Sequence, residues 1–276
     1  MRASGRKENH MAKFVCNFYS RTLLRAVDIT VIIPTSTCPE SLGLGDKPTH
    51  VITDKYPVVY LLHGFGNNHA QWTGYTNVEM YAEERRIAIV NLSAENKSYS
   101  KVGGDDFFTF VSEELPEFVT NMFPISDQPE DTYIAGLSMG GYGSYLHGLT
   151  HPERFAAIGT FSAGVEIVPE QLANMGGGSG FAGAAGGKSV LHDLAKAVKE
   201  DGKTFPKIYA SCGTADFLFG ACKAFADELK ELGADVTWDE IEGYGHEWRF
   251  WDIEVERFLD WLPRKDVYAA KGKRAI

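Results

Sequence analysis

The sequence has few cysteines and no long apolar run, and each scarcity excludes a class of protein. Its four cysteines, Cys16, Cys38, Cys212 and Cys222, are scattered, and no two of them form a C-x-x-C pair. This spacing argues against a disulfide framework and a zinc motif, and it favours buried, reduced thiols. The longest apolar runs, such as 58–62, have the length of a strand, too short to cross a membrane as a helix. Because the first residues also lack the apolar core of a signal peptide, a cytoplasmic location is expected.

Basic residues are also scarce. The 27 Lys and Arg residues against 37 Asp and Glu leave a net charge of −10, and the longest basic tract is 271–274. A surface that follows a phosphate backbone is therefore not expected, so nucleic acid is excluded as a partner. Hydrophobic residues make up 44% and charged residues 23% of the chain, which is close to the average of globular proteins.

The length of 276 residues suits one large α/β domain. We expect residues 1–11 to be a tag remnant or a disordered N-terminus, 12–265 to form the domain, and 266–276 to be a C-terminal tail. Glycine and alanine dominate 176–187, where no periodicity survives. This stretch is predicted to be a flexible insertion, either a mobile cap over a binding pocket or a plain surface loop.

The hydrophobic pattern predicts a parallel sheet preceded by a hairpin. Residues 14–20 and 27–33 are rich in β-formers, and the second run ends at Pro34, so they are predicted to pair antiparallel. Short apolar strands then alternate with amphipathic helical stretches, as in a sheet covered on both faces. The predicted strands are 58–62, 87–92, 132–137, 156–161, 207–211 and 236–241. The predicted helices are 77–86, 107–122, 140–149, 190–199, 221–232 and 247–262.

One strand–turn–helix junction carries a nucleophile motif. The predicted strand 132–137 leads into Gly136-Leu137-Ser138-Met139-Gly140, a Gly-x-Ser-x-Gly sequence that opens the next helix. A serine on such a turn has strained backbone angles, and its hydroxyl is lifted above the sheet. Only small residues two positions before and two positions after it leave room for the neighbouring chain segments. The alternative is a serine that merely caps a helix. The surrounding sequence must decide between the two.

A serine nucleophile needs a base and an acid, in the chain order Ser, Asp, His for this arrangement. Asp216 follows the predicted strand 207–211, and His246 follows 236–241. Carboxyl ends of parallel strands meet at one edge of the sheet, where ligands bind. Asp216 as a helix cap and His246 as a surface histidine are the alternatives, and the surface is the expected place for His10, His50, His147, His151 and His192. The order and the strand context favour a catalytic triad of Ser138, Asp216 and His246.

The turn after strand 58–62 can stabilise negative charge. It contains His63-Gly64-Phe65-Gly66, and we expect the backbone N–H of Phe65 to pair with that of Met139 as an oxyanion hole. His63, placed before the glycines, is predicted to brace the turn rather than to act as a second base.

These residues resemble the esterase D family of α/β-hydrolases, which includes S-formylglutathione hydrolases, feruloyl esterases and bacterial tributyrin esterases. The resemblance spans roughly residues 14–262. Its most specific pieces are HGFGNNH at 63–69 with Trp72, GLSMGGYG at 136–143, GTADFL at 213–218, and GHEW at 245–248 with Trp251. The first piece resembles the tributyrin esterase and feruloyl esterase branch. S-formylglutathione hydrolases carry a Leu-Ser-Gly-type segment at the oxyanion turn, which this sequence lacks.

The resemblance implies an α/β-hydrolase fold and the same residues as nucleophile, acid, base and oxyanion donors. The expected function is that of a serine carboxylesterase acting on short-chain or aromatic acyl esters, without metal or organic cofactor. Aromatic residues near the predicted site are expected to line an apolar substrate pocket: Trp72, Phe217, Phe219 and Trp248. An S-formylglutathione hydrolase or an acyltransferase using the same triad, and a noncatalytic binding module, are the alternatives. Homo-oligomers are left open.

Overall fold

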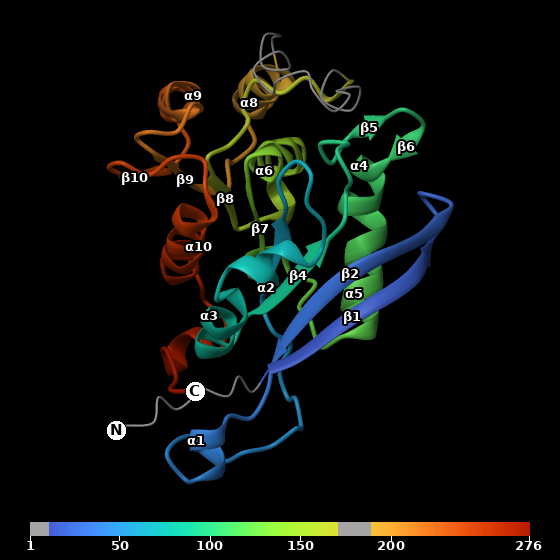
Figure 1. The fold of residues 1–276 in the computed structure, drawn as a ribbon, viewed down its shortest axis with the longest axis vertical. Coiled ribbons are helices and arrows are strands. Elements are labelled where there is room, and N and C mark those ends of the chain that lie inside the picture. Colours follow the sequence, from blue (N-terminus) through green and yellow to red (C-terminus); the bar gives the residue numbers. More distant parts are fainter. Residues whose placement is uncertain (1–10, 171–188) are drawn as a thin grey trace.

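The computed structural model describes residues 11–170 and 189–276 (Figure 1). The glycine-rich insertion predicted at 176–187 lies outside the described residues, as do residues 1–10.

One eight-stranded sheet runs through the molecule in the order β1-β2-β4-β3-β7-β8-β9-β10. β1 (Met11–Ser20) and β2 (Arg25–Pro34) form the predicted antiparallel hairpin, and β2 pairs antiparallel with β4 (Ala88–Leu92). The remaining strands pair in parallel. They are β3 (Val58–Leu62), β7 (Thr132–Leu137), β8 (Ala157–Phe161), β9 (Lys207–Gly213) and β10 (Val236–Ile241). The structure confirms a mostly parallel sheet with leading antiparallel strands.

Helices cover both faces of this sheet because its central strands are apolar on both sides (Figure 1). In β3, Tyr60 and Leu62 belong to one buried cluster, whereas Val59 and Leu61 belong to the other. The first cluster takes in α4 (Phe107–Thr109), α5 (Leu115–Met122), α6 (Met139–Thr150), α8 (Val190–Glu200) and α9 (Phe219–Glu231). The second takes in α2 (Gln71–Tyr75), α3 (Val78–Arg85) and α10 (Trp248–Trp261).

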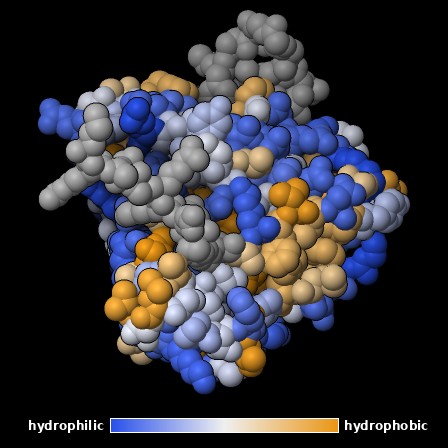
Figure 2. Space-filling view, turned by 60° about the horizontal axis from the view of Figure 1, so that its bottom comes forward, coloured by the Kyte–Doolittle hydropathy of each residue, from blue (hydrophilic) through white to orange (hydrophobic). Residues whose placement is uncertain are grey.

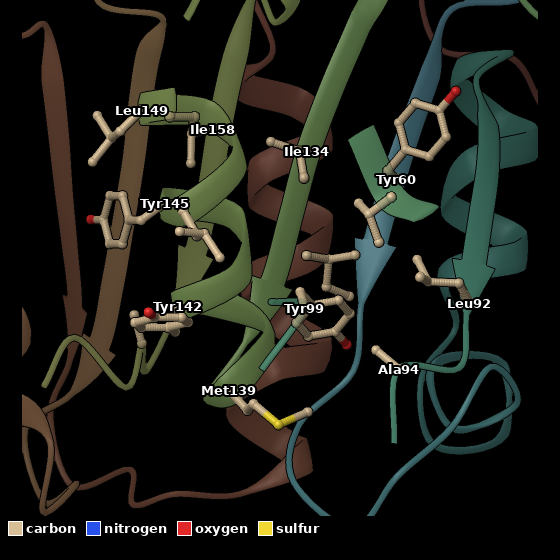
Figure 3. Close-up of a cluster of buried hydrophobic side chains, with 14 of the residues drawn as sticks. Tyr60, Leu92, Ala94, Tyr99, Ile134, Met139, Tyr142, Tyr145, Leu149 and Ile158 are labelled. Atoms are coloured by element: carbon tan, nitrogen blue, oxygen red, sulfur yellow. The ribbon is translucent and has the colours of Figure 1, made fainter. Parts of the chain in front are cut away.

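Helix α6 is central to the first cluster and is buried along its whole length up to Leu149. Tyr142, Tyr145 and Leu149 follow one another at helical spacing and pack on one side of it (Figure 3). Tyr99, which is fully buried, belongs to the same cluster. The helix that begins after Ser138 is therefore held rigidly in the core.

The strand order reverses beside β3. The chain passes from β3 to β4 on one side, and then returns to β7 on the other side of β3. Loops that leave β3 and β7 at their carboxyl ends therefore open a crevice at this switch point, where open α/β sheets bind their ligands. The turn 63–66 and Ser138 leave the sheet there.

The helix predicted over 107–122 is interrupted. A wide π-helical turn, Phe110–Glu114, separates α4 from α5, and the Leu115 N–H donates to the Phe110 carbonyl. Pro116, at the start of α5, has no N–H to give to the preceding turn, and its ring crowds that turn. The wider turn accommodates it.

Several short elements escaped the sequence prediction because they are too brief to show periodicity. They are α1 (Cys38–Ser41), α2, the small hairpin of β5 (Lys101–Val102) and β6 (Asp105–Asp106), and the 3-10 turns Pro129–Asp131, Pro152–Arg154 and Ala269–Lys271. Two cysteine predictions were wrong as well. Cys38 is exposed and Cys16 is partly exposed, whereas Cys212 and Cys222 are buried free thiols as expected.

The C-terminal residues pack onto the domain. Arg274 forms ion pairs with Glu40, at 2.9 Å, and with Glu83, and Tyr268 stacks on Tyr56 with ring centroids 4.6 Å apart. Figure 2 shows the face at the lower end of Figure 1, where hydrophilic and hydrophobic residues both reach the surface. Of the helices that the structure describes, none is long and apolar enough to cross a bilayer.

Candidate active site

Ser138 lies on a strained turn between β7 and α6. Its φ is 53° and its ψ is −115°, in a region that residues with a side chain rarely adopt. A Cβ atom at Gly136 would lie 2.5 Å from the Gly140 carbonyl carbon, and one at Gly140 would lie 2.7 Å from the His63 carbonyl oxygen. Both contacts are too short for a side chain. The glycines on either side of the serine are thus required by the close approach of the turn to β3.

The chain that leaves β8 braces this turn. The Ser138 N–H donates to the Phe161 carbonyl at 3.0 Å, and the Gly164 N–H donates to the Ser138 carbonyl at 2.9 Å. The backbone of Ser138 is therefore held on both sides while its side chain stays available for other contacts.

His246 joins Ser138 to Asp216. Its Nε2 atom lies 3.0 Å from Ser138 Oγ, and its Nδ1 atom lies 2.9 Å from Asp216 Oδ2. The Asp216 side chain is fully buried, whereas 21% of the His246 side chain is exposed. The three residues predicted as a triad thus form one continuous hydrogen-bonded chain.

Neighbouring loops hold the acid and the base together. β9 and β10 pair in parallel, so Asp216 and His246 leave the sheet side by side. The Ala215 N–H donates to the Tyr244 carbonyl at 3.0 Å, and the Gly243 N–H donates to Thr214 Oγ1 at the same distance. These bonds tie the two loops to each other.

The environment of Asp216 favours its ionised form. Burial works to raise the pKa of this carboxyl, but hydrogen bonding and charge interaction with His246 and a hydrogen bond from the Leu218 N–H lower it below the usual value. The Leu218 N–H lies 2.9 Å from Asp216 Oδ1. Asp216 therefore also takes part in the local turn before α9, the alternative that the sequence had suggested for it.

The turn after β3 is braced by side chains around it. His63 is buried; its Nε2 accepts the Ala94 N–H at 3.0 Å, which leaves Nδ1–H to donate to the Gly64 carbonyl at 2.7 Å. Burial lowers the pKa of His63 to about 4, so the ring is neutral. The Tyr99 hydroxyl donates to the His63 carbonyl at 2.8 Å. These contacts fit the predicted bracing role of His63.

Two backbone N–H groups are candidates to face the reacting carbonyl. Met139 is the first residue of α6, and the first N–H groups of a helix have no acceptor within it. Phe65 lies on the braced turn and its carbonyl accepts from Asn67 Nδ2 at 3.0 Å. Both residues flank Ser138, so the predicted oxyanion donors come from the two segments that surround it.

A cleft of about 560 Å³ opens at this site. Its described lining is largely apolar and includes Ser138 and His246, and no Lys or Arg belongs to it. The other lining residues are Gly64, Phe65, Asn67, Leu137, Phe217, Glu247, Trp248 and Trp251. Phe217 and Trp251 contact the imidazole of His246, each with ring centroids 4.9 Å apart.

Two of the four predicted pocket residues lie elsewhere. Trp72 is fully buried, with Nε1 donating to the Leu62 carbonyl at 3.0 Å, and its ring meets Trp248 edge-on. Through this contact, Trp72 supports Trp248, which lines the cleft. Phe219 opens α9 and packs on Trp238 instead. Phe217 and Trp248 do line the cleft, and Phe217 is 65% exposed.

Sequence reasoning did not place five of the residues that line the cleft: Gly64, Asn67, Leu137, Glu247 and Trp251. A usable signal existed for Trp251, since it lies three positions after Trp248 and therefore on the same side of α10.

Of the histidines that the structure describes, those other than His63 and His246 lie outside this constellation. His147 was predicted at the surface but is fully buried in α6, stacked on Phe108, and burial lowers its pKa to about 3. His192 pairs with Glu228 at 2.6 Å. Within 11–170 and 189–276, no group of three or more His, Cys, Asp or Glu residues is placed to hold a metal ion.

A larger cavity of about 630 Å³ lies away from Ser138, between the loop that follows β2 and the C-terminal residues. Two of the cations that line it, Arg86 and Lys271, pair with Asp46, at 3.4 and 3.3 Å, and a third, Arg274, pairs with Glu40. We therefore take the smaller cleft, which contains the reactive side chains, as the candidate active site.

Comparison with known proteins finds esterases and a serine hydrolase among the proteins similar to this chain. A family model described as a putative esterase matches residues 48–264. An acetyl esterase of Caldicellulosiruptor saccharolyticus is 29% identical over 274 residues, covering 92% of this chain and 99% of that protein. An S-formylglutathione hydrolase of Paracoccus denitrificans is 24% identical over 236 residues, covering 75% and 82%. Among solved structures, fluorophosphonate-binding serine hydrolase F of Staphylococcus aureus is 26% identical with a TM-score of 0.78, covering 92% and 99%.

Proposed function

Because this chain belongs to the esterase family and is a carboxylic ester hydrolase of the α/β-hydrolase fold, we propose that Ser138, His246 and Asp216 are its catalytic triad. We propose short-chain or aromatic acyl esters as substrates. The observation that carries the proposal is the position of His246, 3.0 Å from the serine hydroxyl and 2.9 Å from a buried carboxylate. A histidine held in this way can take the serine proton and keep the correct tautomer.

The mechanism follows from the donors and acceptors. Asp216 accepts from Nδ1–H of His246, which leaves Nε2 free to take the proton of Ser138 Oγ. The oxygen attacks the ester carbonyl, and the alcohol leaves with the proton returned by His246. Water, activated by the same imidazole, then releases the acid from the acyl-enzyme. The N–H groups of Phe65 and Met139 are proposed to stabilise the oxyanion of each tetrahedral intermediate.

The cleft supports neutral, apolar acyl groups. Phe65, Phe217 and Trp248 provide aromatic surface, and the one charged residue of the described lining besides the triad is Glu247. Among the described lining residues, an anionic substrate such as a glutathione thioester finds no Lys or Arg, and the net charge of −10 repels it at long range. Aromatic walls favour acetyl to butyryl esters and flat aromatic acyl groups.

A panel of esters tests this substrate class. Acetyl, butyryl and feruloyl esters should be cleaved with higher kcat/KM than S-formylglutathione under identical conditions. Adding one methylene to the acyl chain should change kcat/KM by about 10–200-fold at most, the discrimination that an apolar pocket can supply. A clear preference for S-formylglutathione over every neutral ester would overturn the substrate proposal while leaving the triad intact.

The pH dependence tests the base. Although burial works to raise the pKa of Asp216, its hydrogen bonds and the charge of His246 lower it below the usual value, so the ionised carboxylate is favoured beside the base. kcat/KM should fall on acidification, because an imidazole that already carries a proton on Nε2 cannot take the proton of Ser138. Rates of p-nitrophenyl acetate hydrolysis at limiting substrate give the profile. A flat profile down to about pH 5 would argue against a histidine base.

The cytoplasmic location and the absence of a nucleic-acid partner stay predictions, and no oligomeric state is predicted. Action on small esters fits the family.

A further inference from the structure

The loop between β4 and β5 contacts the turn that contains Phe65, and its backbone is strained. Three of its residues lie in the left-handed region that side chains disfavour, with φ of 50° at Glu95, 52° at Ser98 and 58° at Tyr99. Strain of this kind persists only where the surrounding structure maintains it, and it concentrates near functional sites. The contacts that this loop makes therefore matter for its role.

The Gly64–Phe65 peptide of the turn lies beside the nucleophile. A Cβ atom at Gly64 would be 3.5 Å from Ser138 Cβ and 2.5 Å from Leu137 Cδ1. This peptide is trans, and the carbonyl and the N–H of a trans peptide point in opposite directions. The partners of the Gly64 carbonyl therefore set the direction of the Phe65 N–H, the proposed oxyanion donor.

The loop determines which tautomer of His63 holds that carbonyl. The Gly64 carbonyl accepts from the Asn67 N–H at 3.2 Å and from Nδ1–H of His63 at 2.7 Å. The Ala94 N–H can only donate, so Nε2 of the His63 ring accepts it and the proton of the neutral ring lies on Nδ1. Ala94 thus fixes the tautomer, and the tautomer holds the Gly64–Phe65 peptide.

Side chains of the same loop hold the peptides on either side. The Tyr99 hydroxyl donates to the His63 carbonyl at 2.8 Å. Beyond Phe65, the Gly66 N–H donates to Asn96 Oδ1 at 2.8 Å. Three consecutive peptides of the turn are therefore held from the segment 94–99, the middle one through the His63 ring.

Helix α6 anchors Tyr99 in turn. His147 Nε2 lies 3.0 Å from the Tyr99 carbonyl, which can only accept, so the imidazole donates there. Tyr99 is fully buried, and a Cβ atom at Gly143 would lie 2.5 Å from its Cδ2, so its ring packs directly on the helix. Figure 3 shows its hydroxyl directed at the chain that leaves β3. Because Met139 opens the same helix, α6 supports both proposed oxyanion donors.

We propose that Asn96 and Tyr99 are positioning residues that hold the turn after β3 so that the Phe65 N–H faces the oxyanion of the tetrahedral intermediate. This inference rests on the proposed function of Ser138 and its oxyanion donors. Neither Asn96 nor Tyr99 belongs to the described lining of the cleft, so both act through the turn rather than on the substrate.

Removing either contact should lower the rate without weakening substrate binding. Tyr99→Phe keeps the ring but removes the donor to the His63 carbonyl, and Asn96→Ala removes the acceptor of the Gly66 N–H. In each variant kcat for p-nitrophenyl acetate should fall about 10-fold with KM little changed, because a displaced donor stabilises the oxyanion less. The double variant should be slower than either, up to the roughly 10²–10³-fold that the loss of one oxyanion donor costs.

A transition-state analogue gives the readout that a merely structural role would not move. Ser138 Oγ adds to the carbonyl carbon of an aryl trifluoromethyl ketone, and the carbonyl oxygen becomes an oxyanion like that of the tetrahedral intermediate. The affinity for this ketone should fall by the same factor as kcat/KM in each variant. The pH at which kcat/KM falls should stay that of the wild type, since the lost hydrogen bonds lie on the turn and not on His246.

Tyr133→Phe is the matched control for Tyr99→Phe. Tyr133 is also fully buried, and its hydroxyl donates to a backbone carbonyl, that of Glu130 at 3.2 Å, at the end of β7 away from the nucleophile. Ser100→Ala is the control within the loop, because its hydroxyl donates to the Lys97 carbonyl at 3.0 Å and not to the turn. Both controls should keep the wild-type kcat and the wild-type affinity for the ketone.

Wild-type kcat in both Tyr99→Phe and Asn96→Ala would overturn the inference, and so would a lower kcat with unchanged affinity for the ketone. Melting temperatures identify a variant that fails to fold, and the other variant then decides, because the two contacts hold opposite sides of the same peptide. If the wild type neither hydrolyses esters nor reacts with a fluorophosphonate probe, the proposed function fails as well. If the wild type does both and the variants match it, only this inference fails.

Discussion

Ester hydrolysis should fall on the order of 10⁶-fold when Ser138 is replaced by alanine, because a triad acts as one unit and no other group can form the acyl-enzyme. Folding should change little. Alanine would adopt the same φ of 53° at the same cost as serine, and the bonds that hold the turn come from the backbone of Phe161 and Gly164. Initial rates with p-nitrophenyl acetate and the melting temperature give both quantities.

Ser144→Ala is the matched control for this variant. Ser144 is a buried serine on the same helix, and its hydroxyl donates to the Gly140 carbonyl at 2.8 Å without contacting the triad. Its loss should leave hydrolysis near the wild-type rate and covalent labelling by a fluorophosphonate intact. If Ser138→Ala kept more than about a tenth of the wild-type rate, the assignment of the nucleophile would be wrong.

Replacing His246 by alanine should be almost as damaging, on the order of 10⁶-fold, since the serine hydroxyl is a poor nucleophile without a base. The Ser138→Ala/His246→Ala double variant should be scarcely slower than either single variant, because nucleophile and base serve one step. The residual rate should come from binding and from the oxyanion donors alone.

The same p-nitrophenyl acetate assay, run on the three variants side by side, measures this coupling. His192→Ala serves as the control, since His192 pairs with Glu228 and lies outside the cleft. Losses that multiply in the double variant would mean that His246 acts in a separate step, such as substrate binding, and would contradict the mechanism.

The sequence by itself determined the fold class and predicted the proposed triad. Alternating apolar strands and amphipathic helices predict the parallel sheet, because a strand covered on both faces must be apolar on both sides. The Gly-x-Ser-x-Gly turn follows from sterics that act within a few residues, and the structure shows the clashes that exclude larger residues at Gly136 and Gly140. Since parallel strands end at one edge, Asp216 and His246 could be placed near Ser138 without coordinates.

Only the tertiary structure decided which side chains surround the proposed triad. Trp72 and Phe217 are both aromatic residues in loops beside the site, yet one is fully buried and the other is 65% exposed. His147 was expected at the surface and is buried against Phe108. Local sequence does not encode these differences, because burial depends on packing between segments distant in the chain.

Ser162 shows the same limit most clearly. Trp251 Nε1 donates to the Ser162 hydroxyl at 3.3 Å although 89 positions separate the two residues, and no sequence pattern indicated that they meet. Such a hydrogen bond forms only if the distance between donor and acceptor is correct to within a few tenths of an ångström and the N–H points at the acceptor. Both conditions are set by the packing of α10 against the end of β8. Short-range patterns determine what the reactive groups are, whereas long-range packing determines how they are held and which surfaces they present to substrate.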